Sequence, residues 1–265
     1  GGLGSTYGYP PSPLDNVIFD ENSGFTTTSN IVTTPSYSGI TVKNMTWSNA
    51  PNNPVFDENP GTDFVVLGNI TLQAAMTFRA QVLMMGNQSA TITSNGGKIG
   101  GNIYIDKENA QVELLDSLML YHVNNLDSRT GTIVLANGTL ETNGHNVYAN
   151  GFVMHGTNTC HFNFENSTLF FKKSAIGSHR VSNKYYNTSG TEVTFPSCFR
   201  IEGANKTINA KNSLIQFENI LDGIYVLNNT QYTFDKILYI GHINQVGDQD
   251  GYQHYTGHST FGPAI

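Results

Sequence analysis

The stretch Thr91-Ile-Thr-Ser-Asn-Gly-Gly-Lys-Ile99 returns as Thr139-Leu-Glu-Thr-Asn-Gly-His-Asn-Val147, 48 residues further along the chain. Each copy reads as a short strand, an Asn-Gly corner and a second strand. A separation of 48 residues fits two repeats of about 24 residues, within the range of about 20 to 50 that characterises solenoids and other repeat architectures. The repeat therefore predicts short strands stacked on one another.

Aliphatic residues recur with a similar period. Ile70, Ile92 and Leu114 are each 22 residues apart, so in a coil of that length their side chains would form an inward ladder while the backbone pairs with neighbouring coils. A second echo, Asn166-Ser-Thr-Leu-Phe-Phe171 against Asn212-Ser-Leu-Ile-Gln-Phe217, begins 46 residues apart and is predicted to span two coils. We therefore expect an all-β fold, a right-handed parallel β-helix (β-solenoid) with an N-terminal cap.

Composition agrees with this fold class. The 27 glycines and only 12% charged residues suit short strands and tight corners, whereas long surface helices need more Glu, Lys, Arg and Leu. Asn-Gly pairs at 137–138 and 143–144 are expected to turn corners, because Asn and Gly accept positive φ. The 265 residues suffice for one large all-β domain.

The chain divides into four parts. Residues 1–14, with three prolines in the four positions from 10 to 13, predict an extended lead or linker. Residues 15–63 predict cap strands that end in a turn-rich crossing from 49 to 63, since a terminal coil must cover its apolar core. Residues 64–240 predict the β-solenoid, and residues 241–265, without strand rhythm, predict a tail or a link to a following domain.

Charge argues against two classes of partner. The net charge is −7 and the 13 Lys and Arg residues are scattered, so no basic stripe could neutralise phosphates and we expect no nucleic-acid partner. No apolar run approaches the roughly 20 residues that span a bilayer, and no signal peptide precedes Gly1. We therefore expect no membrane insertion and a mature or trimmed, water-soluble fragment.

The two cysteines, Cys160 and Cys198, are 38 residues apart, which predicts a distance of one or two coils between them. In an oxidising compartment they could form a disulfide between neighbouring coils. The alternative is that each is a small buried core residue with no special chemistry.

One segment has the spacing of a metal loop. Asp57-Glu-Asn-Pro-Gly-Thr-Asp63 places oxygen ligands at Asp57, Asn59 and Asp63, which suits Ca²⁺. Asp and Asn also form turns by bonding their own backbone, and this alternative predicts no cofactor. His254 and His258 lack the Cys or carboxylate partners that would complete a zinc site.

Several tyrosines are candidates for ligand binding. Tyr185 and Tyr186 lie in a polar stretch, residues 172–191, that reads as an excursion from the stack, and Tyr252 and Tyr255 lie in the C-terminal segment. Flat amphipathic rings beside Asn, Asp and His suit a sugar-binding surface, and loops that leave a rigid scaffold often carry binding sites. The alternative is that these rings anchor their own loops.

An ordered set of motifs resembles a known group of proteins. The segments Asn16-Val-Ile-Phe-Asp-Glu-Asn-Ser23, Val42-Lys-Asn-Met-Thr-Trp47, Asn69-Ile-Thr-Leu72 and Gly138-Thr-Leu-Glu-Thr-Asn-Gly-His-Asn-Val147 resemble β-helical regions of large secreted surface proteins of Bacteroidetes. Those proteins are type IX secretion cargo and gliding-motility adhesins. The resemblance covers residues 15–170 and implies export, display on the outer cell surface, attachment to glycans or other surfaces, and contact with type IX secretion and outer-membrane components through a longer parent protein.

An enzymatic alternative comes from architecture alone. Pectate-lyase-like β-helices are similar in fold and use acidic groups on Ca²⁺ with a basic residue as proton acceptor; here Arg180, beside His179, is the candidate base. We expect a non-enzymatic domain of an exported cell-surface adhesin, with the solenoid as a rigid display scaffold. The alternatives are a polysaccharide lyase or hydrolase and a purely structural spacer of a giant surface filament.

Overall fold

The structure is a computed structural model. It describes residues 10–34, 39–57, 64–120, 131–171, 179–181, 193–195, 198–217, 223–226, 230–239 and 259–261. Every regular element in these ranges is a β-strand, so the predicted all-β class is confirmed. None of the described segments forms a helix of the length and apolar character needed to cross a membrane.

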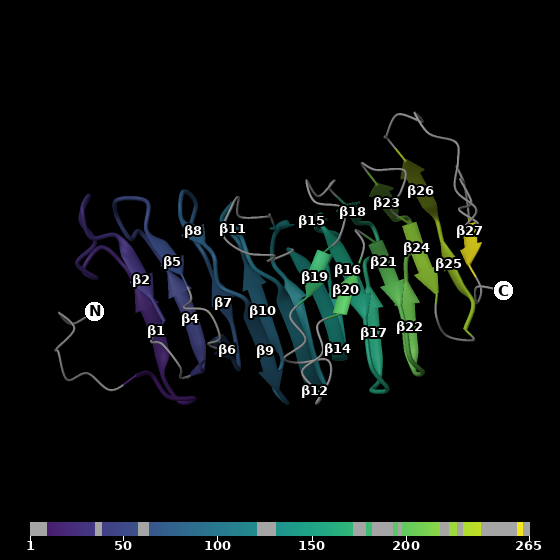
Figure 1. Ribbon diagram of the computed structural model, residues 1–265, viewed down its shortest axis with the longest axis horizontal. Coiled ribbons are helices and arrows are strands. Elements are labelled where there is room, and N and C mark those ends of the chain that lie inside the picture. Colours follow the sequence, from purple (N-terminus) through teal and green to yellow (C-terminus); the bar gives the residue numbers. More distant parts are fainter. Residues whose placement is uncertain are drawn as a thin grey trace.

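Most strands pair in parallel and fall into three ladders. Figure 1 shows the strands side by side along the long axis, from β1 and β2 at one end to β25 and β27 at the other. The first ladder contains β3 (Ile40–Val42), β6 (Phe64–Val66), β9 (Val82–Gly86), the first half of β12 (Ile103–Leu114), the first half of β14 (Thr132–Glu141), β16 (Gly151–Met154), β21 (Cys198–Ile201) and β24 (Gly223–Val226).

The second ladder contains β1 (Asn16–Phe19), β4 (Asn44–Trp47), β7 (Ile70–Thr71), β10 (Ala90–Thr93), the second halves of β12 and β14, β17 (Cys160–Asn163) and β22 (Lys206–Asn209). The third ladder contains β2 (Ile31–Thr33), β5 (Val55–Asp57), β8 (Thr77–Phe78), β11 (Lys98–Ile99), β13 (Leu118–Met119), β15 (Val147–Ala149), β18 (Thr168–Phe171), β23 (Leu214–Phe217) and β26 (Lys236–Tyr239).

Two long strands join the first two ladders. Because β12 and β14 each pair in both ladders, these ladders form one 14-stranded sheet. The third ladder consists of a four-stranded and a five-stranded sheet, which a single parallel bridge between Ile99 and Leu120 connects. From β3 to β24 the chain visits the first, second and third ladders in the same order each time, apart from the antiparallel pair β19 (His179–Val181) and β20 (Val193–Phe195).

The predicted aliphatic ladder is confirmed. Ile92 pairs with Ile70 on one side and with Leu114 on the other, and all three side chains are buried. The second echo spans a different distance from the one predicted: β18 pairs directly with β23, so Thr168 lies beside Leu214 although the two are 46 residues apart. The reason is that the excursion after β18, which includes β19 and β20, lengthens this one interval.

The N-terminal part joins the same ladders. Residues 15–63, for which the sequence predicts a cap, contribute β1 to β5, and these strands pair in parallel with β4 to β8. The predicted crossing from 49 to 63 contains β5, a strand that the sequence analysis did not anticipate because prolines flank it. At the C-terminal end, β25 (Tyr232–Phe234), in the segment predicted as solenoid, pairs in antiparallel fashion with β27 (Ser259–Phe261), in the segment predicted as a tail or link.

Asparagines turn the corner between the second and third ladders. Asn95, Asn143, Asn166 and Asn212 all have φ between 47° and 59°. The side-chain amides of Asn95 and Asn143 donate to the carbonyls of Leu72 and Leu114, at 2.8 and 3.1 Å, so both copies of the quoted motif bond to the preceding corner.

The predicted corner at 137–138 is wrong in one respect: Asn137 and Gly138 lie inside β14, where the strand passes from the first ladder to the second. Gly138 has φ +85°, and a Cβ there would collide with the carbonyl of Lys107. The glycine is therefore required by the close approach of β12 rather than by a chain reversal.

The interior is one continuous apolar cluster that extends from Phe25 to Ile237. A second, smaller cluster lies outside it and consists of Leu83, Tyr104, Val134, Ala136 and Val153. Leu83, Tyr104, Val134 and Val153 occupy one register position of the first ladder, between inward neighbours such as Ile103 and Ile105. Burial raises the pKa of the Tyr104 phenol to about 12.

Candidate functional site

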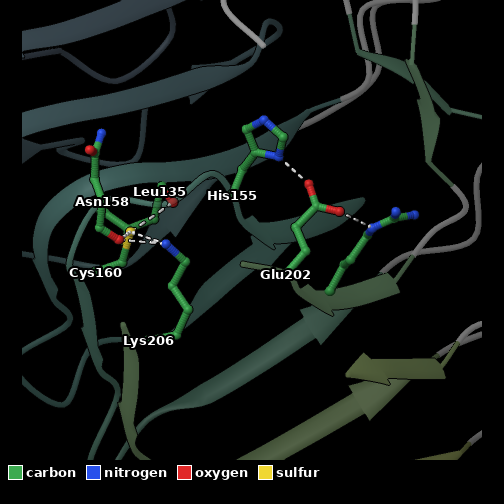
Figure 2. Close-up of polar contacts among 7 residues, drawn as sticks. Leu135, His155, Asn158, Cys160, Glu202 and Lys206 are labelled. Atoms are coloured by element: carbon green, nitrogen blue, oxygen red, sulfur yellow. Dashed lines mark hydrogen bonds and ion pairs between the residues drawn. The ribbon is translucent and has the colours of Figure 1, made fainter. Parts of the chain in front are cut away.

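The candidate site lies where two neighbouring strand pairs turn from the first ladder to the second. Residues 155–159 connect β16 to β17, and residues 202–205 connect β21 to β22. Parallel pairing places Met154 beside Ile201 and Cys160 beside Lys206, so the two turns stack on each other. Figure 2 shows the polar side chains that this stacking gathers.

Three of these side chains form an ion-pair chain. The Glu202 carboxylate contacts His155 Nδ1 through Oε1 and accepts a hydrogen bond from Arg200 Nε through Oε2, at 2.9 Å (Figure 2). The side chains of His155 and Arg200 are 24% exposed and that of Glu202 is 17% exposed. Burial raises the pKa of Glu202, but the His155 hydrogen bond and the Arg200 charge outweigh it and hold that pKa below its usual range.

Two further side chains meet in the interior beside this turn. Lys206 Nζ lies 2.6 Å from the carbonyl of Asn158 and 3.3 Å from Cys160 Sγ (Figure 2). The Cys160 thiol in turn lies 3.4 Å from the carbonyl of Leu135. Burial raises the pKa of the Cys160 thiol, although the Lys206 ammonium opposes the rise. A buried thiol with a raised pKa is a poor nucleophile, because the thiolate is the reactive form.

Cys160 is a free, buried cysteine in this structure, as in the alternative to a Cys160–Cys198 disulfide, and the Cys198 side chain lies outside the described residues. Cys160 pairs with Gly138 and Lys206 in the second ladder, whereas Cys198 begins β21 and pairs with Gly223 in the first. The Cys160 thiol makes its contacts with Lys206 and with backbone carbonyls instead.

A second buried lysine occupies the equivalent junction further toward the N-terminus. Lys107 is fully buried, and its Nζ donates to the carbonyls of Leu67 and Met85 at 2.5 and 2.8 Å. Leu67 directly follows β6 and Met85 lies near the end of β9, so one ammonium connects β12 to the two preceding layers of the first ladder. Burial lowers the pKa of Lys107 to about 8.

The burial of these two lysines was not predicted, although the sequence contains a pattern that indicates each of them. Lys107 continues the inward alternation of Ile103 and Ile105, and Lys206 stands two residues before Ile208. A lysine at an inward position of a strand is a candidate for a buried, hydrogen-bonded ammonium.

The polar side chains at the two stacked turns bond to one another and to backbone carbonyls. The Glu202 carboxylate is shared between His155 and Arg200, and Lys206 binds a carbonyl. Among the residues that the structure describes, no three His, Cys, Asp or Glu side chains are grouped so that they could hold a metal ion. The cluster therefore has the bonding of a structural element that fixes two stacked turns.

Most of the residues predicted as ligands lie outside the described ranges. This holds for Tyr185, Tyr186, Tyr252, Tyr255, Asn59, Asp63 and the side chains of Cys198 and Arg180. Asp57 is described at the end of β5, where its carboxylate lies 3.4 Å from the Arg79 guanidinium. Asp57 thus takes part in an ion pair between neighbouring strands.

A partly exposed aromatic pair is the second candidate surface. Tyr148 in β15 and Phe170 in β18 pair in register, and their rings stack with centroids 4.5 Å apart and planes 2° apart. Both rings are partly exposed, because the inward positions of these strands belong to Val147, Ala149 and Leu169. Gln216 follows Phe170 in the same register, so an amide adjoins the rings. The sequence analysis favoured other tyrosines and did not identify this outer aromatic pair, Tyr148 and Phe170.

Comparison of the chain with models of protein families, with curated proteins and with solved structures found no match.

Proposed function

We propose that this chain is a right-handed parallel β-helix that serves as a stiff, non-enzymatic display scaffold in an exported adhesin on the outer cell surface. The observation that carries the proposal is the register of the strands. It continues from β1 to β22 in the second ladder; in the third it runs from β2 to β11 and from β13 to β26, and the Ile99–Leu120 bridge joins the two parts. The return of the chain to three ladders in a constant order, each time beside its previous strand, supports a β-helix.

The bonding of the polar groups supports the scaffold role. Lys107, Lys206 and Glu202 bind carbonyls or partner side chains of neighbouring turns. Asparagines form similar bonds between strands on the outer face of the second ladder. Asn44 Nδ2 donates to Asn16 Oδ1 at 2.6 Å, and the backbone N–H of Asn69 donates to Asn44 Oδ1 at 2.6 Å. Each such bond connects two stacked strands and resists their separation.

The outer aromatic pair supports a role in attachment. Ring faces pack against the C–H groups of a saccharide, and a neighbouring amide such as that of Gln216 can bond its hydroxyls. Attachment to surface glycans, with secretion through type IX components by way of a longer parent protein, completes the proposal.

The test is binding of the purified chain to a glycan array. We expect binding to at least one class of saccharide, and we expect the double variant Tyr148→Ser and Phe170→Ser to lose it. Thr207→Ser, at an exposed position of β22, is the control and should bind as the unmodified chain does. Binding unchanged in the double variant would contradict the role of the outer aromatic pair. Release of unsaturated products from polyuronides would contradict the non-enzymatic assignment.

A further inference from the structure

The N-terminal end of the three ladders presents unpaired strand edges. Within the described residues, β1, β2 and β3 pair on one side only, with β4, β5 and β6. An edge strand offers a row of N–H and C=O groups that a further strand can bond. Two apolar side chains on these edge strands are also exposed: Ile18 is 53% and Ile31 60% accessible.

A cavity of about 750 Å³ opens behind this edge. Its lining includes inward side chains of the first strands, namely Val17, Phe19, Val32, Ile40, Val42 and Met45. On its other side, each of these inward side chains has a neighbour from the next strand: Val17 lies beside Met45, Val32 beside Phe56 and Ile40 beside Phe64. The cavity is therefore the place where the inward side chains of one more strand layer would lie.

The opposite end of the second ladder differs. There β25 pairs with β27 in antiparallel fashion, and the Phe234 ring of β25 packs against Phe164 and Phe199 at centroid distances of 6.5 and 5.5 Å. The chain thus supplies its own aromatic side chain over the interior at that end, although within the described residues β22, like β1, pairs on one side only. The cavity and the unpaired edges occur together at the N-terminal end.

Charge identifies the kind of strand that fits. Residues 10–42 contain Asp15, Asp20 and Glu21 and no Lys or Arg. A second copy of the chain would bring like charges together and would place one cavity against another, with nothing to fill either. A strand with basic flanks has complementary charge, and alternate apolar side chains would enter the cavity while its backbone extends the edge.

We propose that the N-terminal end is a docking site for an extended polypeptide of another protein, with alternating apolar side chains flanked by Lys or Arg. It adds to β1 as a further strand and inserts its apolar side chains between Val17, Val32 and Ile40, which is recognition by β-strand addition. This site is independent of the outer aromatic pair and of glycan attachment.

The probe is a fluorescent peptide with the sequence of residues 40–47, Ile-Thr-Val-Lys-Asn-Met-Thr-Trp, with one lysine added at each end. This sequence already forms strands that cover the next layer of the ladders. The control peptide carries Ser in place of Val, Met and Trp. Fluorescence anisotropy should show saturable binding of the first peptide to the full chain and none of the second.

Two protein variants locate the site. Val32→Trp fills the cavity and should weaken peptide binding by about tenfold or more, because central, well-packed contacts carry most of the affinity. Glu21→Lys leaves the cavity unchanged and should weaken binding by about threefold through lost charge attraction. Glu108→Lys, at an exposed position of β12 far along the ladders, is the matched control and should have no effect.

Equal binding of both peptides, or no binding of either, would overturn the proposal. Unchanged affinity in both Val32→Trp and Glu21→Lys would also overturn it, and the Glu21→Lys result decides if Val32→Trp fails to fold. A concentration-dependent dimer in sedimentation that Val32→Trp abolishes would assign the end to a second copy and would likewise overturn it. Loss of glycan binding has no bearing on these results.

Discussion

The middle of the molecule and its C-terminal half keep the same parallel register, although their interiors are built from different side chains. Around β7, β10 and β12 the interior is aliphatic, with Ile70, Ile92 and Leu114 in one column. Around β16, β17 and β21 it is aromatic: Phe152 stacks on Phe162 at 4.1 Å and on Phe199 at 5.1 Å. The register therefore depends on inward and outward alternation and on corner contacts, and many apolar side chains can fill the interior.

The two regions also differ in interval. In the middle, 22 residues separate paired positions such as Ile70 and Ile92, whereas 46 residues separate Cys160 from Lys206. The longer interval includes the excursion with β19 and β20, yet the chain returns to pair beside its previous strand. The cost of closing a loop grows only slowly with its length, so the ladders tolerate this insertion.

The largest expected loss of stability follows from a substitution that leaves a cavity in the aromatic region. Phe199 is fully buried and contacts the rings of Phe152, Phe171 and Phe234. We expect Phe199→Ala to lower the free energy of unfolding by about 4 kcal/mol, and Ile92→Ala in the middle by about 3 kcal/mol. Urea unfolding followed by circular dichroism measures both. A smaller loss for Phe199→Ala than for Ile92→Ala would contradict the view that the aromatic interior is as tightly packed as the aliphatic one.

Lys107 sharpens the comparison because it places a charge inside the aliphatic region. Its pKa is about 8 in the folded chain against 10.5 ordinarily, so the unfolded chain binds more protons between these values and stability rises with pH through this window. The difference corresponds to about 3 kcal/mol. We expect urea unfolding to show the rise between pH 7 and 10 and Lys107→Met to abolish it.

The control for this prediction is Lys98→Met, at an exposed position of β11, which should retain the rise. Stability that falls between pH 8 and 10 in the unmodified chain would contradict the assignment to Lys107. Above pH 9.0 the Cys160 thiol, whose pKa is raised, acts in the opposite direction, and above pH 10 so does the Tyr104 phenol, with its pKa raised to about 12, because the unfolded chain releases these protons first.

Substitution of a corner asparagine is expected to cause a smaller loss of stability. Asn143 has φ 52° and bonds to the Leu114 carbonyl. Asn143→Ala loses this bond and places an alanine in the left-handed region, so we expect a loss of about 2 kcal/mol. Asn143→Gly keeps the conformation and should lose about 1 kcal/mol or less. The order of the two midpoints in thermal unfolding checks this, and equal losses would show that φ does not matter here.

The smallest effect concerns Glu202 in the aromatic region. Its pKa is lowered in the folded chain, so its contribution is present above its ordinary pKa and is lost as the pH falls through the lowered value. We expect Glu202→Gln to cost about 1 kcal/mol or less at pH 7, since the group is partly exposed. The difference between variant and unmodified chain should shrink as the pH falls below 4.5, the ordinary pKa of the group, and a difference that grows on acidification would contradict this account.

The strand positions were predictable where apolar and polar residues alternate, as in Ile70, Ile92 and Leu114, because alternation fixes which side chains face inward. The Asn-Gly corner at 143–144 was predictable because left-handed φ restricts the choice of residue. The 46-residue echo was misread, since spacing alone does not distinguish two strand layers from one layer with an excursion. The site around Lys206 and Glu202 was missed because it depends on contacts between turns that are 46 or 47 residues apart.

The most direct test of the stacked register is a pair of distances measured by pulsed electron paramagnetic resonance. Asn16 is at the start of a second-ladder column that continues through Glu141 and Asn163 to Asn209. With strands about 4.8 Å apart, spin labels at 16 and 163 should be about 29 Å apart and labels at 16 and 209 about 34 Å apart. A difference of about one strand spacing across 46 residues is the result that the β-helix predicts. Equal distances, or a shorter distance to 209, would mean that the sheet closes on itself and would contradict it.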